Sequence, residues 1–397
     1  MPRFEPFQAL RYRRNVDLHD VCSPPYDVLS DLDRLALATA HANNIVHIDM
    51  PLASSGNAYE HAAVVLNQWI TEGVLVRDDQ PSFTLYRMKF TDTTGKARNV
   101  VGVIGALEVV DEGAGGVLPH ERTTPKAKTD RLELTRATDA NLSPVWGLSL
   151  ATGLSTLLTE PAELLGELTD DLGVVHSVER VTDDAHIAAI SAAIAAHPVV
   201  IADGHHRYAI SRTYRDEVRE RTNSTSTGAE LTMTYVNELI DEQLSVAAIH
   251  RLYEGITYKE LAAALSPFFT INDADPVGPS TLSQMNERGS LCLVAKTGRT
   301  HWLTPIAEKF AGVRNLDSAY LEHALSSVQH EVRYQHGVTE VQHELSTSDA
   351  AAAILIRPVS VAEIQRTANE GLLMPPKSTF FSPKLRTGFV LREMKTR

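Results

Sequence analysis

Residues 198–208 read Pro-Val-Val-Ile-Ala-Asp-Gly-His-His-Arg-Tyr and contain the change from a strand to a helix that decides the fold. The β-branched residues 199–201 predict a short buried strand that ends at Ala202. Residues 208–220 are rich in helix formers, and their apolar or aromatic side chains lie on one face of an amphipathic helix: Ala209, Ile210, Tyr214 and Val218. The sequence therefore predicts a strand, a polar turn and a helix, as in an α/β fold.

The turn between strand and helix, Asp203-Gly204-His205-His206-Arg207, has the chemistry of an anion site. Glycine lets the backbone turn sharply, and the N–H groups and dipole of a helix start favour phosphate, as do imidazole and guanidinium groups. We predict that Gly204, His205 and Arg207 bind phosphate. We further predict that His206 is catalytic and that Asp203 is catalytic or holds a metal ion. The alternative is structural, with Asp203 as a helix cap and the other residues in a solvated first turn.

A second charged segment, residues 118–131, follows a glycine-rich hinge at 112–116. It places Glu121 among several cationic side chains, which suits a base that takes a hydroxyl proton beside a bound polyphosphate. We predict a lid or clamp in which Glu121 is the catalytic base and His120 contacts the substrate. Its phosphate-binding residues would be Arg122, Lys126 and Lys128. The alternative is an exposed charged loop.

Two proline-stiffened segments complete the candidate residues. Pro24-Pro25 restricts the backbone before Tyr26 and Asp27, for which we predict substrate contacts. Asp27 can equally cap the helix expected from about Ser30. Residues 371–388 contain three prolines and phosphate-compatible side chains, and form either a phosphate clamp or a structural clasp over a sheet edge. The residues assigned to phosphate here are Lys377, Ser378 and Lys384.

Three regions are expected along the chain: an N-terminal α/β region at 1–112, a central region at 117–255 and a C-terminal α/β region at 256–397. Periodicity predicts helices at residues 31–41, 58–72, 131–139, 160–167, 185–196 and 259–265. It predicts strands at 82–90, 99–109, 141–150, 231–236, 244–249, 290–295 and 351–357, with a hairpin turn at 92–95 and with His250 and Arg251 at a strand end.

Composition restricts the class of protein. The 397 residues carry a formal net charge of −13, which argues against a surface that binds DNA or RNA, so no nucleic-acid partner is expected. No secretory signal is evident and the apolar runs are too short to span a bilayer, so we expect a cytoplasmic protein without a membrane partner. The two cysteines, Cys22 and Cys292, show no zinc or redox spacing, and the histidines at 323–343 show no metal-ligand pattern.

Five motifs in the expected order make the chain similar to a prokaryotic family, domain of unknown function 1015. They are Pro24-Pro25-Tyr26-Asp27-Val28, His120-Glu121-Arg122-Thr123, Asn141-Leu142-Ser143-Pro144, Ala202-Asp203-Gly204-His205-His206-Arg207-Tyr208 and Met374-Pro375-Pro376-Lys377-Ser378-Thr379. The Asp-Gly-His-His-Arg element also resembles the phosphate-binding box of the ParB/sulfiredoxin superfamily, which includes free-serine kinases and CTP-binding partition proteins. The resemblance implies a mixed α/β (α+β) fold with a ParB/sulfiredoxin-like nucleotide-binding core and additional α/β segments.

The leading hypothesis is a nucleotide-dependent phosphotransferase for a small polar metabolite, with ATP or ADP and Mg²⁺ as cofactors. The resemblance to free-serine kinases makes serine the first acceptor to test. One alternative is a regulatory protein that binds or hydrolyses a nucleotide without binding DNA. Another is a metal-dependent phosphoesterase that uses Asp203, His205 and His206. The sequence lacks a Gly-x-x-x-x-Gly-Lys-Ser/Thr loop, a Gly-x-Ser-x-Gly elbow and a Gly-x-Gly-x-x-Gly fingerprint.

Overall fold

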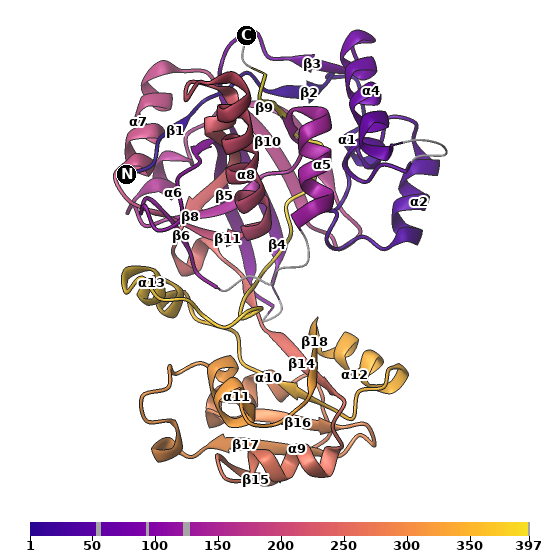
Figure 1. Cartoon of the computed structure of the whole chain (residues 1–397), viewed down its shortest axis with the longest axis vertical. Coiled ribbons are helices and arrows are strands. Elements are labelled where there is room, and N and C mark those ends of the chain that lie inside the picture. The colour runs from indigo at the N-terminus through magenta and orange to yellow at the C-terminus, as the bar shows by residue number, and fades with distance from the viewer. Residues whose placement is uncertain (53–56, 93–94, 122–127, 396–397) are drawn as a thin grey trace. The chain divides into compact units, whose positions relative to one another are not determined.

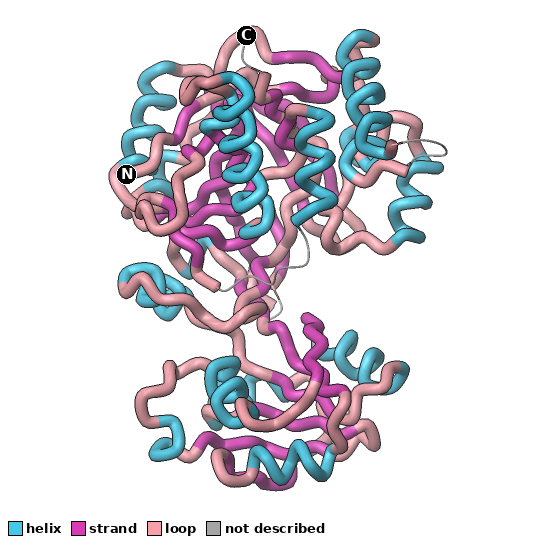
Figure 2. The backbone as a smooth tube through the Cα atoms, in the orientation of Figure 1, coloured by secondary structure: helices cyan, strands magenta, loops and turns pink. Residues whose placement is uncertain are grey.

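The computed structural model describes the chain except residues 53–56, 93–94, 122–127 and 396–397 (Figure 1). The chain forms two compact units, each of which contains both helices and strands (Figure 2). The first unit comprises Met1–Ser245 and Pro383–Arg397, and the second comprises Val246–Ser382. The second unit is therefore an insertion in the sequence of the first. The predicted three-part division at 1–112, 117–255 and 256–397 stays a prediction.

The first unit is built on a mixed sheet, which has nine strands among the described residues. Eight of them follow the order β6-β11-β8-β12-β5-β4-β10-β9, and β1 also pairs with β5. The pairs β6 with β11 and β8 with β12 are parallel, whereas the other pairs are antiparallel. The bounds are β1 Phe4–Glu5, β4 Phe83–Thr91, β5 Ala97–Glu108, β6 Val117–Pro119, β8 Val145–Ser149, β9 Glu163–Thr169, β10 Val175–Val181, β11 Val199–Asp203 and β12 Leu231–Glu238.

The first unit also contains helices and short strands outside this sheet. The helices are α1 Leu18–Val21, α2 Asp31–Ala40, α3 Val46–Asp49, α4 Ala58–Thr71, α5 Lys128–Thr138, α6 Leu154–Leu157, α7 Asp184–Ala195 and α8 His205–Thr222, with 3₁₀ turns at Gly228–Glu230 and Asp241–Gln243. Two small ribbons pair β2 Leu10–Tyr12 with β3 Leu75–Arg77, and β7 Ala140–Asn141 with β21 Arg392–Glu393.

The two faces of the sheet bury different partners, because successive residues of a strand point to opposite faces. On one face, Phe83 and Leu85 of β4 join a core that includes Ile190 and Ile194 of α7 and Tyr208 of α8. On the other face, Tyr86 of the same strand packs edge-on against Tyr235 of β12 and against Phe389, with ring centroids 5.9 and 5.3 Å apart. Phe389 belongs to residues 383–395, the C-terminal segment of the first unit. Helices thus cover one face, and the C-terminal segment packs against the other.

The second unit is an antiparallel sheet, with six strands among the described residues in the order β15-β17-β16-β19-β14-β18. Helices α9 and α11 pack on one face, and α10 and α12 pack on the other. The bounds are β14 Ile249–Glu254, α9 Tyr258–Leu265, β15 Phe269–Ala274, α10 Thr281–Arg288, β16 Leu291–Ala295, β17 Thr300–Pro305, a 3₁₀ turn at Ala307–Phe310, α11 Asp317–Leu325, β18 Glu331–His336, α12 Val338–Thr347, β19 Ala352–Leu355 and α13 Val361–Asn369. A separate ribbon pairs β13 Val246–Ala247 with β20 Phe380–Phe381.

The mixed α/β class predicted from the sequence is confirmed, and so are most predicted helices and strands. The ParB/sulfiredoxin-like core stays a prediction. None of the helices in the described residues has the length and apolar character needed to traverse a bilayer.

Several local predictions are wrong. The helix predicted at 160–167 is mostly strand β9, whose residues pair with β10 at the sheet edge and whose alternating apolar positions were too few to reveal a strand. His250 and Arg251 lie inside β14 instead of at a strand end, because the strand runs on to Glu254. Asp27 does not cap α2, since Ser30 accepts the Asp33 N–H and forms a capping box with Asp33.

A substitution at Gly102 tests the tight contact between β5 and β12. A Cβ atom at Gly102 would lie 2.3 Å from Cζ of Tyr235, whose side chain is completely buried. We expect Gly102→Ala to lower the free energy of unfolding by about 1–3 kcal/mol, because the ring has no free space to move into. Urea unfolding followed by circular dichroism would measure the loss. The control is Gly278→Ala, where the nearest atom is 3.9 Å away and little change is expected; equal losses in both variants would contradict the packing described.

Candidate functional site

The predicted anion-binding turn lies where strand β11 meets helix α8. Asp203 is the last residue of β11, and Gly204 takes a left-handed conformation with φ 83° and ψ 30°. A Cβ atom at Gly204 would lie 2.9 Å from Nε of Arg207, because the arginine side chain folds back over the turn. Gly204 is the N-cap of α8, so the alternative that Asp203 caps this helix is wrong. The helix begins without a side-chain cap, which is the arrangement that leaves backbone N–H groups for an anion.

Asp203 is held between two cations at this turn. Its Oδ2 lies 2.9 Å from Nη2 of Arg207, and its Oδ1 lies 3.3 Å from Nζ of Lys384. Burial alone would raise the pKa of Asp203, but the charges of Lys384, Arg207 and His205 outweigh burial and hold the pKa well below its usual range. Arg207 also donates through Nη1 to the carbonyl oxygen of Pro144. The structure thus places Lys384, which the sequence analysis predicted to bind phosphate, beside the turn at residues 203–207.

Lys384 reaches Asp203 because the C-terminal segment is fastened to the first unit at several points that follow Lys384 in the chain. Ser23 and Thr387 exchange two backbone hydrogen bonds of 3.0 and 2.9 Å. Further along, Leu391 exchanges two with Leu10, and β21 pairs with β7. These contacts fix the path of the segment, so the position of Lys384 follows from backbone pairing.

A buried hydrogen-bond chain supports the same segment from the sheet. The Tyr86 hydroxyl accepts the backbone N–H of Arg386 at 3.0 Å. It also bonds to Nδ1 of His176 at 2.8 Å, and Nε2 of His176 lies 3.1 Å from Oδ2 of Asp170. Burial raises the pKa of Tyr86, so its hydroxyl stays neutral. Tyr86 is buried, and its role is to hold the backbone of the segment that carries Lys384.

His120 and Glu121 lie beside the turn because β6 pairs in parallel with β11. The ring of His120 packs against the ring of His205 with centroids 4.9 Å apart, and its Nδ1 lies 2.5 Å from the carbonyl oxygen of Ile201. This geometry makes Nδ1–H the donor. Burial lowers the pKa of His120 to about 4, so the ring is neutral at pH 7. Oε2 of Glu121 lies 3.9 Å from Nε2 of His120, and its side chain is only 14% exposed.

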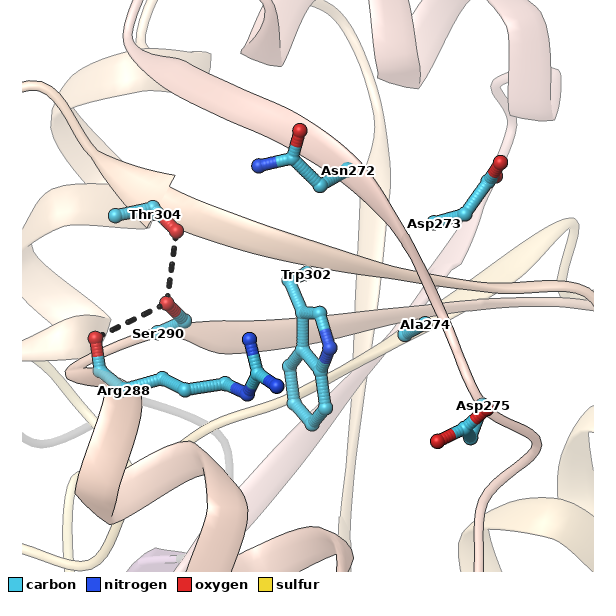
Figure 3. Close-up of a pocket in the computed structure, with 8 residues that line it drawn as sticks. All are labelled: Asn272, Asp273, Ala274, Asp275, Arg288, Ser290, Trp302 and Thr304. Atoms are coloured by element: carbon cyan, nitrogen blue, oxygen red, sulfur yellow. Dashed lines mark hydrogen bonds between the residues drawn. The ribbon is translucent and has the colours of Figure 1, made fainter.

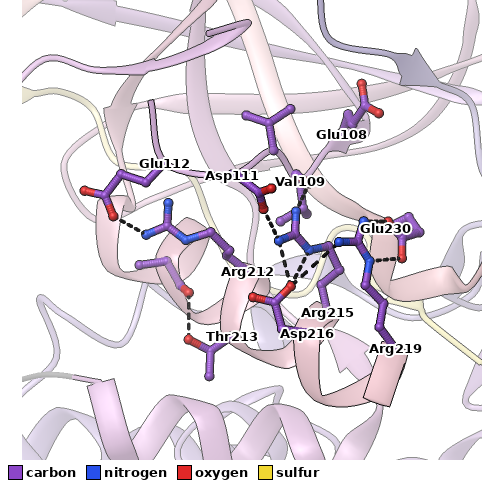
Figure 4. Close-up of polar contacts among 12 residues, drawn as sticks. Glu108, Val109, Asp111, Glu112, Arg212, Thr213, Arg215, Asp216, Arg219 and Glu230 are labelled. Atoms are coloured by element: carbon purple, nitrogen blue, oxygen red, sulfur yellow. Dashed lines mark hydrogen bonds and ion pairs between the residues drawn. The ribbon is translucent and has the colours of Figure 1, made fainter. Parts of the chain in front are cut away.

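Arginines of α8 fix the chain that leads from β5 into β6 (Figure 4). Arg215 donates through Nη1 to the carbonyl oxygen of Val109 and pairs with Asp111. One turn earlier in the helix, Arg212 pairs with Glu112 at 2.9 Å. The helix that begins at the predicted anion-binding turn therefore also anchors the segment that leads to His120 and Glu121.

A third group of residues lies next to Arg207. The guanidinium of Arg131 lies over the ring of Tyr26, 3.5 Å from its centroid, and Nη1 of Arg131 pairs with Oδ1 of Asp49 at 2.9 Å. Burial alone would lower the pKa of Arg207, but the negative charge of Asp203 raises it, with smaller effects from Tyr26 and Asp27. A cavity of about 50 Å³ is lined by residues that include Asp49, Arg131 and Arg207. Tyr26 therefore lies near Arg207 and Arg131, and its contact with a substrate stays a prediction.

Two residues of this group were missed in the sequence. Arg131 lies in the charged segment, but the sequence analysis gave it no role. Its position at the start of the helix that follows the segment was a signal that could have identified it. Asp49 had no signal, because its partner Arg131 is distant in sequence and Asp49 ends the short helix α3.

The remaining predicted residues divide into three kinds. His206 is the second residue of α8 and is partly exposed. Lys377 and Ser378 belong to the second unit, where the fully buried Ser378 hydroxyl contacts the Ser318 hydroxyl at 3.0 Å and donates to Pro375 at 2.8 Å. Arg122 and Lys126 lie outside the described residues, and Lys128 begins α5 without a described side chain.

No cluster of three or more histidine, cysteine, aspartate or glutamate side chains suited to a metal ion occurs in the described part of the chain. Both carboxylate oxygens of Asp203 already face cations, so a metal ion there would have to displace Lys384 or Arg207. The assignment of Asp203 as a metal ligand stays a prediction.

The sequence of this chain matches one known protein family. A family model described as "Protein of unknown function (DUF1015)" matches residues 4–319, which confirms the resemblance inferred from the five motifs. No curated protein matches the chain.

Several solved structures are similar to the chain at low identity. A conserved hypothetical protein from Pyrococcus furiosus is 11% identical with a TM-score of 0.38, and the match covers 69% of this chain and 92% of that one. A free serine kinase in complex with AMP is 12% identical with a TM-score of 0.39, covering 70% of this chain and 88% of that one. SbnI from Staphylococcus aureus, with a C-terminal truncation, is 13% identical with a TM-score of 0.40, covering 72% and 85%.

The buried His120 makes stability depend on pH in a defined direction. Its folded pKa of about 4 lies below the ordinary value of 6.5, so the unfolded chain takes up the proton first. The contribution of neutral His120 to the free energy of unfolding is complete above pH 6.5. It decreases as the pH falls towards 4, by roughly 3 kcal/mol in all. We expect His120→Asn, which keeps a donor near the Nδ1 position, to flatten the dependence of the unfolding free energy on pH over this range. Urea titrations at several pH values would measure the slope.

The matched control is His61→Asn, on the exposed side of α4. We expect its slope to equal that of the wild type. A His120→Asn protein with the wild-type slope would show that His120 is not held neutral by burial.

Proposed function

We propose that this chain, which belongs to the DUF1015 family of proteins of unknown function, is a nucleotide-dependent phosphotransferase that acts on a small polar metabolite, with free serine as the first candidate acceptor. The observation that supports the proposal is the pairing of Asp203 with Lys384 and Arg207 at the uncapped start of an 18-residue helix. Such a site offers backbone N–H groups, a helix dipole and two cations to one phosphate group.

Asp203 holds the two cations in place before the nucleotide binds. Cations that are already fixed need not reorganise when a phosphate binds, so the site is organised for a polyphosphate. A phosphate oxygen would share Lys384 with Asp203, while Arg207 stays bonded to Asp203 and Pro144. Lys384 is therefore the cation that would contact the phosphate most directly, and Gly204 would allow the phosphate to approach the backbone.

Glu121 is the proposed base for the acceptor hydroxyl. It is mostly buried beside the neutral ring of His120, so its carboxylate has little competition from solvent. In the proposed step the acceptor oxygen gives its proton to Glu121 and forms a bond to the terminal phosphorus. The bond between that phosphorus and its bridging oxygen breaks, and ADP leaves if the donor is ATP, or AMP if the donor is ADP.

Other predicted residues have supporting roles in this proposal. His205 and His206 are placed at the first turn of α8 and would contact the nucleotide phosphates, with His206 the more exposed candidate. Tyr26 and Asp27, whose charges act on Arg207, would contact the acceptor. Mg²⁺ commonly adds positive charge to a transferring phosphoryl group, but the described residues provide no separate metal cluster, and no step here depends on one.

Phosphorus NMR of the purified protein with ATP or ADP, Mg²⁺ and a pool of amino acids and small alcohols tests the proposal. We expect a new phosphomonoester signal, with serine examined first among the acceptors. Glu121→Gln should lower the rate by about 100- to 10,000-fold, as loss of a general base does, while nucleotide affinity is retained. Lys384→Met should instead weaken nucleotide binding by about 10- to 100-fold, since it removes a charged hydrogen-bond donor, and His206→Ala should lower activity as well.

The matched control is Lys89→Met, because Lys89 is exposed on β4. It should leave both affinity and rate unchanged. Release of inorganic phosphate without an acceptor would replace the transferase by a nucleotide-hydrolysing regulator. Absence of nucleotide binding would refute the phosphate assignment of residues 203–207.

A further inference from the structure

The second unit contains a polar groove of about 540 Å³ beside the edge strand β15 (Figure 3). Strands β15 and β17, with the end of helix α10, provide its lining. Small-molecule sites commonly have volumes of about 300–1,000 Å³. We propose that this groove binds a small zwitterion of the α-amino-acid class, with its carboxylate on Arg288 and its ammonium group on Asp275. The proposal is independent of the phosphotransferase proposal, which concerns residues of the first unit.

Arg288 has the features of a carboxylate receptor. Its guanidinium lies over the indole of Trp302, with Cζ 5.2 Å from the ring centroid. Stacking fixes the plane of the guanidinium and leaves its N–H edges directed outward. Within the described residues Arg288 forms no ion pair, whereas a carboxylate pairs with each of five other arginines of the unit: Arg299, Arg314, Arg333, Arg357 and Arg366. The fork of donors is therefore available to a ligand.

Asp275 provides the opposite charge on the other side of Trp302 (Figure 3). Its neighbour Asp273 is already used, since Oδ1 of Asp273 lies 3.1 Å from Arg299 and 3.3 Å from His301. In the part of the unit that the structure describes, the Asp275 carboxylate has no ion pair, and only its backbone carbonyl accepts a hydrogen bond, from Thr300 at 2.8 Å. An ammonium group at Asp275 would complete a pair that the protein itself leaves incomplete.

The charges on the two sides of the groove select a bipolar ligand. A phosphate or other dianion would be repelled by Asp273 and Asp275, and a simple cation would be repelled by Arg288. Next to Arg288, the hydroxyls of Ser290 and Thr304 bond to each other at 2.8 Å and add polar groups to the lining of the groove (Figure 3). The indole edge of Trp302 gives the ligand's carbon atoms an apolar contact. These features match a molecule with a carboxylate and an ammonium group on a short carbon skeleton.

The indole N–H signal of Trp302 in a ¹H–¹⁵N NMR spectrum tests the proposal on the full chain. The protein has three tryptophans, so Trp302→Phe identifies the signal by its loss. Glycine, L-serine, L-alanine and L-glutamine would be titrated, with acetate and methylammonium as probes that carry one charge each. We expect at least one amino acid to shift the Trp302 signal saturably, and the single-charge probes to bind at least about 10-fold more weakly.

Arg288→Gln and Asp275→Asn should each weaken amino-acid binding by about 10- to 100-fold, because each removes one charged hydrogen-bond partner. The matched control is Arg333→Gln, which removes an exposed arginine of the same unit that does not line the groove. The dispersion of the same spectra reports whether each variant is folded. If Arg288→Gln is not folded, Arg288→Lys is used instead. No shift with any amino acid would overturn the proposal. So would unchanged affinity in the folded Arg288 or Asp275 variants, or acetate binding as tightly as an amino acid.

Discussion

The carboxylate of Asp203, held between Arg207 and Lys384, is the interaction on which the candidate site depends. It joins three parts of the first unit: the end of β11, the first turn of α8 and the C-terminal segment. A buried carboxylate without partners would be costly, and two cations close together would repel each other. Each charge is thus stabilised by the others, and the arrangement is maintained only while all three segments are in place.

The mixed sheet explains why these segments meet. Parallel pairing of β6 with β11 places His120 and Glu121 beside the end of β11. The opposite face of the sheet binds the C-terminal segment through Tyr86 and Phe389, and this contact directs Lys384 to the turn. Residues from three distant parts of the sequence thus converge. The edge of the sheet pairs β6 with β11, and one face of the sheet binds the C-terminal segment.

Sequence reasoning identified the parts of the site that depend on local chemistry. The turn at 203–207 follows directly from β-branched residues, a glycine and a helical periodicity, so its strand, turn and helix could be predicted. Lys384 was predicted as a phosphate ligand from the composition of its loop. Its ion pair with Asp203 could not be predicted, because only the tertiary structure brings the two residues together. Asp49 had no local signal at all. The error at 160–167 has a similar cause, since β9 is stabilised by pairing with β10 more than by its own periodicity.

The same limit applies to the second unit. Periodicity predicted helix α9 and strands β16 and β19 of this unit, but Arg288 and Asp275 are ordinary charged residues in the sequence. Only the fold places them on either side of Trp302. Conversely, Ser378 looked like a phosphate ligand in a Lys-Ser-Thr run, yet its hydroxyl is fully buried against Ser318 in this unit.

The insertion of Val246–Ser382 into the sequence of the first unit has a consequence for biosynthesis. A ribosome completes Asp203 and Arg207 long before Lys384, because the whole second unit must be translated in between. During that interval the Asp203–Arg207 turn lacks its second cation, and the sheet face around Tyr86 lacks the segment that covers it. The nascent chain therefore exposes aromatic surface until the inserted unit has left the exit tunnel. The site proposed to bind phosphate is therefore completed only after the inserted unit has been translated, and a chain that stops within that unit cannot form it.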